Sequence, residues 1–86
     1  MFYTYVLKSK KDNNLYIGFS SNLKRRLMEH NKGLVEITKS RRPFKLVYYE
    51  ACLSKTDALI REKELKTGFG RGYLRRRLKN SINLPS

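Results

Sequence analysis

The pattern of hydrophobic and polar residues predicts that the chain begins with two short strands. Residues 1–8 read MFYTYVLK, in which Tyr3, Tyr5 and Leu7 alternate with Phe2, Thr4 and Val6, a strand period in strand-favouring residue types. A polar cluster follows at residues 10–14, where KKDNN is typical of a turn. Residues 15–19 read LYIGF and have the composition of a second strand. We therefore expect these two segments to form an antiparallel hairpin.

Helical spacing replaces the alternation in the next segment. Residues 22–32 read NLKRRLMEHNK, and we expect a helix there with Ser20 or Ser21 as its N-cap and Gly33 as its stop. The polar residues 34–43 end at a proline and are expected to form a basic loop.

The second half of the chain is expected to contain one more strand and two helices. Residues 44–51 have strand composition, and Ser54 with Asp57 resembles a capping box at the start of a helix over residues 57–66. A short basic helix is expected over residues 73–79. Three glycines are expected to break the chain before it, namely Gly68, Gly70 and Gly72.

These elements follow one another in the order β-β-α-β-α-α, which places the chain in the mixed α/β (α+β) class. A chain of 86 residues provides enough sequence for one domain. We expect that domain to span residues 1–80 and residues 81–86 to form a flexible C-terminal tail.

The chain carries a large positive charge. Twenty Lys and Arg residues against seven Asp and Glu residues give a formal net charge of +13 at pH 7, and the excess is spread over both halves. A folded domain with this charge repels itself, so a polyanionic partner is the expected reason for it. Nucleic acid is the first interpretation, an anionic membrane surface the second, and a surface kept basic only for solubility the third.

Other protein classes are excluded by what the sequence lacks. No apolar stretch approaches the roughly 18 residues of a membrane span, and the apolar start is too short for a signal peptide. The single Cys52 allows no internal disulfide and no cysteine-based zinc site, and one histidine allows no histidine-rich metal site. We therefore expect a cytoplasmic protein with no membrane partner.

Two residues of the first predicted helix lie where packing alone would not place them. On a helical wheel, Leu23 and Leu27 form the apolar stripe, His30 falls just inside its edge and Arg26 lies beside it, whereas Arg25 points to solvent. The alternative is that Arg26 extends along the surface and His30 is an ordinary, partly buried histidine.

The second predicted helix places a carboxylate in its apolar stripe. Glu62 falls between Ala58, Leu59 and Leu65 on the wheel, whereas Glu64 falls outside. A carboxylate directed at a core is costly unless it is paired, hydrogen-bonded or bound to a metal. This placement suggests a functional role, and the alternative is a structural ion pair with an arginine.

Two tyrosines of the predicted hairpin form the third feature. Tyr5 and Tyr16 lie on adjacent strands, and Gly18 shares a face with Tyr16, so the backbone can be approached closely there. The alternative is that the tyrosines are core residues with their hydroxyls at the rim.

Taken together, these positions resemble the GIY-YIG nuclease superfamily. The resemblance rests on Tyr5, the run Tyr16-Ile17-Gly18, Arg26 with His30 on the next helix, and Glu62 on a later helix. It is strongest to small standalone bacterial members and next to the N-terminal nuclease domain of the excinuclease C subunit. It implies a three-stranded antiparallel sheet flanked by helices, and metal-dependent hydrolysis of DNA phosphodiester bonds, with a role in DNA repair or processing.

The resemblance also implies roles for these residues. Glu62 matches the carboxylate that holds one divalent ion, Mg²⁺ or Mn²⁺, and Arg26 matches the arginine that faces the scissile phosphate. Tyr5 and Tyr16 match the two motif tyrosines, and His30 occupies a position near the site. Tyr16 is favoured as the general base, with Tyr5 and His30 orienting water or phosphate.

The sequence departs from the family pattern at three places. The first motif reads Tyr3-Thr4-Tyr5, so that only its tyrosine is kept, and Phe19 stands where some members carry a lysine. An asparagine found beyond the glutamate in larger members has no match in residues 66–68. These departures leave the metal ligand and the arginine in place and affect the general base.

The remaining basic residues are expected to contact the phosphates of a nucleic acid, with DNA as the expected partner, without reading its bases. We expect a monomeric endonuclease with little sequence specificity and no small-molecule cofactor. One alternative is a non-catalytic basic nucleic-acid-binding module that retains the fold, and another is a regulatory protein that binds an acidic partner. The expected phosphate contacts are Lys39, Arg41, Arg42, Arg71, Arg75, Arg76 and Arg77.

Overall fold

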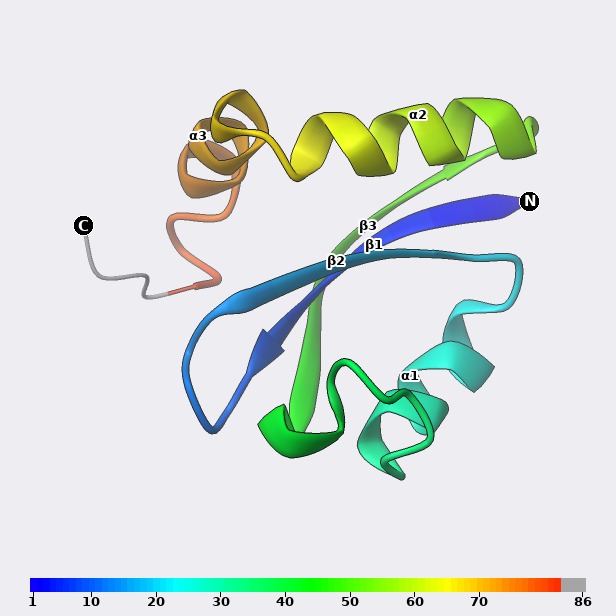
Figure 1. The fold of residues 1–86 in the computed structure, drawn as a ribbon. Coiled ribbons are helices and arrows are strands. Elements are labelled where there is room, and N and C mark those ends of the chain that lie inside the picture. Colours follow the sequence, from blue (N-terminus) through cyan, green and yellow to red (C-terminus); the bar gives the residue numbers. More distant parts are fainter. Residues whose placement is uncertain (83–86) are drawn as a thin grey trace.

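A computed structural model describes residues 1–82, in which three strands form one antiparallel sheet with helices on both of its faces (Figure 1). The β-β-α-β-α-α order and the three-stranded antiparallel sheet are both confirmed. The elements are β1 (Phe2–Ser9), β2 (Leu15–Ser20), α1 (Leu23–Asn31), β3 (Phe44–Cys52), α2 (Lys55–Leu65) and α3 (Gly68–Arg77), with a short 3₁₀ helix at Lys39–Arg41 before β3.

The central strand is β1, which pairs with β2 on one side and with β3 on the other. Tyr5 lies opposite Gly18 on β2 and opposite Tyr49 on β3. Because successive side chains of a strand point to opposite faces, a central strand covered on both faces needs apolar residues at consecutive positions. The sequence of β1 meets this need, since Val6 and Leu7 are both fully buried.

The two faces of the sheet are covered by different helices. Figure 1 shows α1 on one side and α2 with α3 on the other. Val6 packs with Leu65 and Leu74 in the core on the α2–α3 side. Tyr5 and Leu7 pack in a second core, on the α1 side of the sheet. The other residues of this core are Phe44, Tyr16, Leu23, Leu27 and Leu46.

The starts of α1 and α2 differ from the prediction by one or two residues. Asn22 caps α1 by accepting a hydrogen bond from the backbone N–H of Arg25 at 3.1 Å, so the prediction of Ser20 or Ser21 as the cap is wrong. The hydroxyl of Ser20 instead bonds the backbone of Asn22, at 2.9 and 3.0 Å. Ser54 caps α2 as predicted, with α2 beginning at Lys55.

The prediction that three glycines break the chain is wrong, because α3 begins at Gly68 and runs through the other two. Thr67 caps this helix by accepting a hydrogen bond from the backbone N–H of Gly70 at 3.2 Å. A Cβ at Gly70 would overlap the backbone of Leu65. Glycine at this position therefore allows the first turn of α3 to lie directly against the end of α2.

The core extends to the end of the described chain. Ile82 is buried and packs in the α2–α3 core, two residues past the expected domain boundary. The rest of the expected tail, residues 83–86, lies outside the described residues. Within residues 1–82, no helix has the length and apolar character that crossing a membrane requires.

Candidate active site

A buried chain of hydrogen bonds connects β1, α1 and the loop after α1. The hydroxyl of Tyr5 lies 2.8 Å from Nε2 of His30, and Nδ1 of His30 lies 2.7 Å from the hydroxyl of Thr38. All three side chains are almost fully buried, at 1%, 0% and 0% exposure. The helical wheel places His30 on the buried side of α1 correctly, because α1 packs that side onto the sheet.

The partners of Thr38 determine the direction of this chain. Its hydroxyl lies 3.4 Å from the carbonyl oxygen of Val35 and donates to it. Because the hydroxyl has one proton, it accepts from His30, so Nδ1 of the imidazole carries the hydrogen and Nε2 is bare. Nε2 then accepts the proton of the Tyr5 hydroxyl, and the Tyr5 oxygen keeps its lone pairs for other donors.

The surroundings of His30 keep it neutral. Burial lowers the pKa of His30 from 6.5 to about 4, and the positive charge of Arg26 lowers it further, against the opposing effect of Glu29. A neutral imidazole has one donor and one acceptor nitrogen, as the hydrogen-bond chain requires. His30 is therefore a fixed acceptor for Tyr5 at neutral pH.

Tyr5 is protonated at neutral pH. Burial raises its pKa to about 12, and the nearby hydroxyl of Tyr16 and carboxylate of Glu62 act in the same direction. The guanidinium of Arg26 opposes them, first as a hydrogen-bond donor toward the hydroxyl and second by its positive charge, because both favour the phenolate. Three of the other four residues identified from the sequence, Tyr16, Arg26 and Glu62, are thus near enough to influence the Tyr5 hydroxyl electrostatically.

The strand β2 provides the floor beneath Tyr5. A Cβ on Gly18 would overlap the Tyr5 hydroxyl, so only glycine leaves room for the tyrosine to lie across β2. Tyr16, two residues earlier on the same face, packs edge-on against His30 with 5.2 Å between ring centroids and lies 6.5 Å from the ring of Tyr5. The spacing Tyr-Ile-Gly therefore has a direct packing reason, because Ile17 between them is buried in the opposite core.

Arg26 reaches this group from α1. Its Nη1 pairs with Glu29 at 3.2 Å, and its side chain is 36% exposed. Its Nε, however, is buried and has no hydrogen-bond partner among the described residues. A buried donor without a partner is unusual in a folded protein, and a guanidinium N–H is a strong donor to phosphate oxygens. Arg26 therefore offers a donor to an anion at this site.

Glu62 approaches from α2, on the other side of the sheet. Its side chain is 19% exposed, and its Oε2 accepts a hydrogen bond from Nζ of Lys66 at 3.1 Å. The expected apolar stripe is narrower than the wheel indicates, because Leu59 is 36% exposed while Ala58 and Leu65 are buried. Glu62 consequently lies at the border of the core and not inside it.

The predicted alternative for Glu62, a structural ion pair with an arginine, is also absent among residues 1–82. Arg61, the arginine beside it in sequence, pairs with Glu50 at 3.0 Å and lies 4.9 Å over the ring of Tyr73. The partner of Glu62 is the largely exposed Lys66, and ion pairs of this kind contribute little to stability. The carboxylate is therefore not held in place by the needs of the fold.

The residues present fit a divalent ion whose coordination is completed by water and substrate. Within the part of the chain that the structure describes, no three His, Cys, Asp or Glu side chains gather in a group that could hold a metal. Mg²⁺ prefers oxygen ligands, keeps several waters and is commonly held by one or two carboxylates with substrate phosphates. The half-buried carboxylate of Glu62 meets this description.

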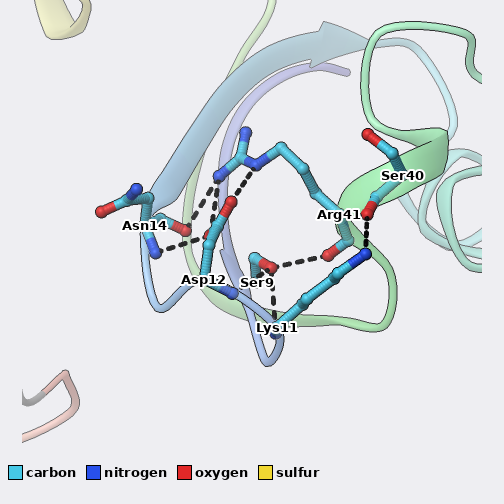
Figure 2. Close-up of polar contacts among 6 residues, drawn as sticks. All are labelled: Ser9, Lys11, Asp12, Asn14, Ser40 and Arg41. Atoms are coloured by element: carbon cyan, nitrogen blue, oxygen red, sulfur yellow. Dashed lines mark hydrogen bonds and ion pairs between the residues drawn. The ribbon is translucent and has the colours of Figure 1, made fainter.

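Two of the predicted phosphate-binding residues are engaged by the protein itself. Figure 2 shows Arg41 paired with Asp12 in the turn between β1 and β2, at 2.7 Å from Nε to Oδ2. Its hydrogen bonds lower the pKa of Asp12 to about 2. Arg42 donates from Nε to the carbonyl of Lys39 at 2.8 Å. Arg41 thus connects the loop before β3 to the turn between β1 and β2 through this ion pair. Its contact with phosphate stays a prediction.

The basic residues of α3 divide into two sets. Arg71 and Arg75 line a pocket of about 550 Å³ between α3 and residues 14–17 of the chain, together with Lys66 and Leu74. The other two, Arg76 and Arg77, are exposed and lie outside this pocket.

Sequence reasoning missed two residues of the site, Thr38 and Lys66. Thr38 lies eight residues after His30, in a segment with no periodic pattern, so its contact depends on the course of the loop. Lys66 is four residues after Glu62 on the same helix, and this i, i+4 spacing is a signal from which the ion pair could have been predicted.

The chain is similar to known proteins over most of its length. A family model described as the GIY-YIG catalytic domain matches residues 1–79. A UPF0213 protein of Staphylococcus haemolyticus is 47% identical over 66 residues, which cover 76% of this chain and 79% of that protein. A UPF0213 protein of Pediococcus pentosaceus is 39% identical over 86 residues, covering 99% of this chain and 90% of the relative.

A solved structure is similar as well. The solution NMR structure of a UPF0213 protein from Bacillus halodurans superposes with a TM-score of 0.55 at 30% sequence identity. The match covers 96% of this chain and 88% of that chain. The similarity therefore extends over nearly the whole chain.

Proposed function

Because the chain belongs to the GIY-YIG family of nuclease domains, we propose that it is a divalent-metal-dependent endonuclease that hydrolyses DNA phosphodiester bonds with little sequence specificity. The observation that carries this proposal is the unpartnered, buried Nε of Arg26 beside the Tyr5 hydroxyl. A scissile phosphate is the ligand that such a donor fits, and the positive charge of the surface supports a nucleic-acid partner.

The role of Arg26 follows from where charge develops in the reaction. Hydrolysis places additional negative charge on the phosphate oxygens, and a donor fixed in advance stabilises that charge without reorganisation. Glu29 holds Nη1, so Nε and the remaining N–H groups of the guanidinium are directed by the protein before substrate binds. Loss of such a donor typically lowers the rate by about 10²–10³.

We assign different roles to the two tyrosines. Tyr5, with its pKa raised to about 12, keeps its proton in a hydrogen bond to His30 and orients the phosphate or the attacking water by accepting a hydrogen bond. Tyr16 is less buried and packs against the same imidazole, so we assign to it the role of general base: its own proton is first released to solvent, and the phenolate then accepts the proton of the attacking water. His30 and Thr38 position Tyr5 and do not exchange protons with substrate.

Glu62 is the residue that would hold the divalent ion, Mg²⁺ or Mn²⁺, which when bound supplies positive charge that polarises the phosphate and stabilises the leaving oxygen. Until then Lys66 keeps the carboxylate in position. The exposed cations of α3 and of the loop around residue 39 contact flanking phosphates and set the affinity for DNA.

The proposal is tested by incubating the purified chain with labelled duplex, single-stranded and branched DNA and with RNA, in Mg²⁺, in Mn²⁺ and in chelator. Cleavage should require the metal and should fall at least 10²-fold in Glu62→Gln. Glu64→Gln is the matched control, because Glu64 lies two residues further along the same helix and 54% of its side chain is exposed. Equal cleavage by the two variants, or cleavage that persists in chelator, would refute the proposal.

A further inference from the structure

The pocket between β2 and α3 has a construction that the cleavage chemistry does not require. On one wall lies β2, which pairs only with β1 and so leaves its outer backbone edge unpaired. On the other wall lie Arg71 and Arg75, which are four residues apart and therefore on the same side of α3. Lys66, at the end of α2, completes the rim.

The pocket is strongly cationic. Its lining includes three basic residues and no Asp or Glu. Neither Arg71 nor Arg75 forms an ion pair with a carboxylate within residues 1–82, whereas Arg26, Arg41 and Arg61 all do. Bringing unpaired cations together around a hollow destabilises the free protein and raises its affinity for an anion.

The apolar lining and the volume of the pocket indicate a ligand larger than a single phosphate group. Leu15, and to a smaller extent Ile17, contribute apolar surface between the cations, and about 550 Å³ is far more than one phosphate group fills. A nucleotide carries an anionic phosphate together with a flat base that gains from apolar contact. Asn14, at the rim, has a side-chain amide that points away from the Asp12–Arg41 pair in Figure 2 and offers a donor and an acceptor.

The pocket adjoins the candidate active site. Lys66 lines it and also holds Glu62 at 3.1 Å, and Tyr16 lines it while its ring packs against His30. A nucleic-acid strand whose phosphate lies at Arg26 and Glu62 therefore has the pocket beside it. A base that is paired in a duplex is not available to enter such a hollow, so the occupant is unpaired.

We propose that this pocket binds one unpaired nucleotide of a DNA strand next to the cleaved bond, with its phosphate on Lys66, Arg71 and Arg75 and its base over Leu15. This inference rests on the proposed nuclease function and narrows its substrate to single-stranded DNA or to branched DNA with a single-stranded segment. The same cationic rim would attract an acidic peptide, but the apolar floor and the adjacent phosphate site favour the nucleotide.

The test measures binding in chelator, so that cleavage plays no part. Fluorescence anisotropy with a labelled oligothymidine, an abasic strand of equal length and charge, and a duplex reports the three affinities. The pocket variant is Arg71→Gln with Arg75→Gln, and the control is Arg76→Gln with Arg77→Gln, which removes the same charge from the same helix outside the pocket.

The pocket variant should lose at least tenfold more affinity for oligothymidine than the control variant, while both should lose affinity for duplex equally. The unmodified protein should bind oligothymidine more tightly than the abasic strand, and the pocket variant should not distinguish them. Equal losses for oligothymidine, or equal affinity of the unmodified protein for the two strands, would overturn the proposal.

Two further outcomes are decisive. An oligoglutamate of equal charge that binds more tightly than the strand, and loses that affinity in the pocket variant, would assign the pocket to an acidic protein and overturn the proposal. A protein that binds as expected in chelator but cleaves no substrate with Mg²⁺ or Mn²⁺ would disprove the nuclease function and support the pocket as a nucleotide site.

Discussion

Acid should destabilise this domain through His30. The pKa of His30 is about 4 in the folded protein, against 6.5 for the ordinary side chain. Between these values the unfolded chain binds a proton that the folded chain does not, so stability falls as the pH falls from 6.5 to about 4. The two pKa values differ by about 2.5, and at 1.36 kcal/mol for each unit the loss amounts to about 3 kcal/mol.

The surroundings of His30 explain why the folded protein resists this proton. Its ring is fully buried and meets Tyr5, Tyr16 and Phe44 edge-on, so that no water replaces the hydration that a charged imidazole loses. Of the charged groups nearby, Arg26 opposes protonation and Glu29 favours it. The loss should therefore belong to His30 itself, because the lowered pKa of Asp12, about 2, acts only at more acid pH.

The assay is urea unfolding followed by circular dichroism at pH values from 4 to 7.5. The control is His30→Gln, which retains hydrogen-bonding capacity but does not titrate, so that the other acidic groups contribute equally to both proteins. The unmodified protein should lose about 3 kcal/mol more than this variant over the range. Equal pH dependence in the two proteins would refute the reasoning.

A second measurement serves if the variant does not fold. His30 is the only histidine in the chain, so its imidazole Cε1 proton gives a single NMR signal whose titration reports the folded pKa directly. A midpoint near 4 is expected. A midpoint near 6.5 would show that the ring is hydrated and that the buried hydrogen-bond chain does not form.

The remaining predictions concern packing and binding. Gly18→Ala should destabilise the fold by about 1–3 kcal/mol in thermal unfolding and remove cleavage, because the added methyl group overlaps the hydroxyl of Tyr5. Gly68→Ala is the control: its methyl group meets open space and should change stability by less than about 0.5 kcal/mol. Thr38→Val should lower the free energy of unfolding by about 1–3 kcal/mol in urea, because it leaves the Nδ1–H of His30 buried without an acceptor. It should also move the imidazole ¹⁵N shifts away from those of the Nδ1–H tautomer, and unchanged shifts would contradict the direction assigned to the hydrogen bond between His30 and Thr38. DNA affinity should fall by about 10³–10⁵ between 50 and 200 mM salt if six to ten phosphates are contacted, and a flat salt dependence would exclude nucleic acid as the partner.

The element order is predictable from the sequence because it depends on local periodicity. Strand-favouring residue types on either side of a polar turn identify β1 and β2, and the helical repeat identifies α1 with the correct buried face, since Leu23, Leu27 and His30 lie on one side of it. The start of α3 is mispredicted for a tertiary reason. Each glycine weakens a helix by about 1 kcal/mol relative to alanine, but Gly70 allows a close contact with Leu65 that no local rule contains.

The site is only partly predictable for a related reason. A helical wheel gives the direction of a side chain, but it does not show whether another element covers that side chain. Ala58 and Leu65 are buried, yet Leu59, on the same predicted stripe, is not, and Glu62 lies at the border between covered and uncovered positions. The contact of Thr38 with His30 depends on the course of a loop without periodicity, so nothing in the sequence indicates it.

The unpaired edge of β2 connects these observations. An exposed strand edge invites pairing with another strand, and proteins commonly protect such edges with charge. Here Lys66, Arg71 and Arg75 lie beside that edge, and their charge opposes pairing with another β-strand. The same charge attracts an anionic chain, which does not pair with a strand edge through backbone hydrogen bonds. A fourth strand paired with β2 would fill this pocket, so the pocket exists because the outer edge of β2 is unpaired within the described residues.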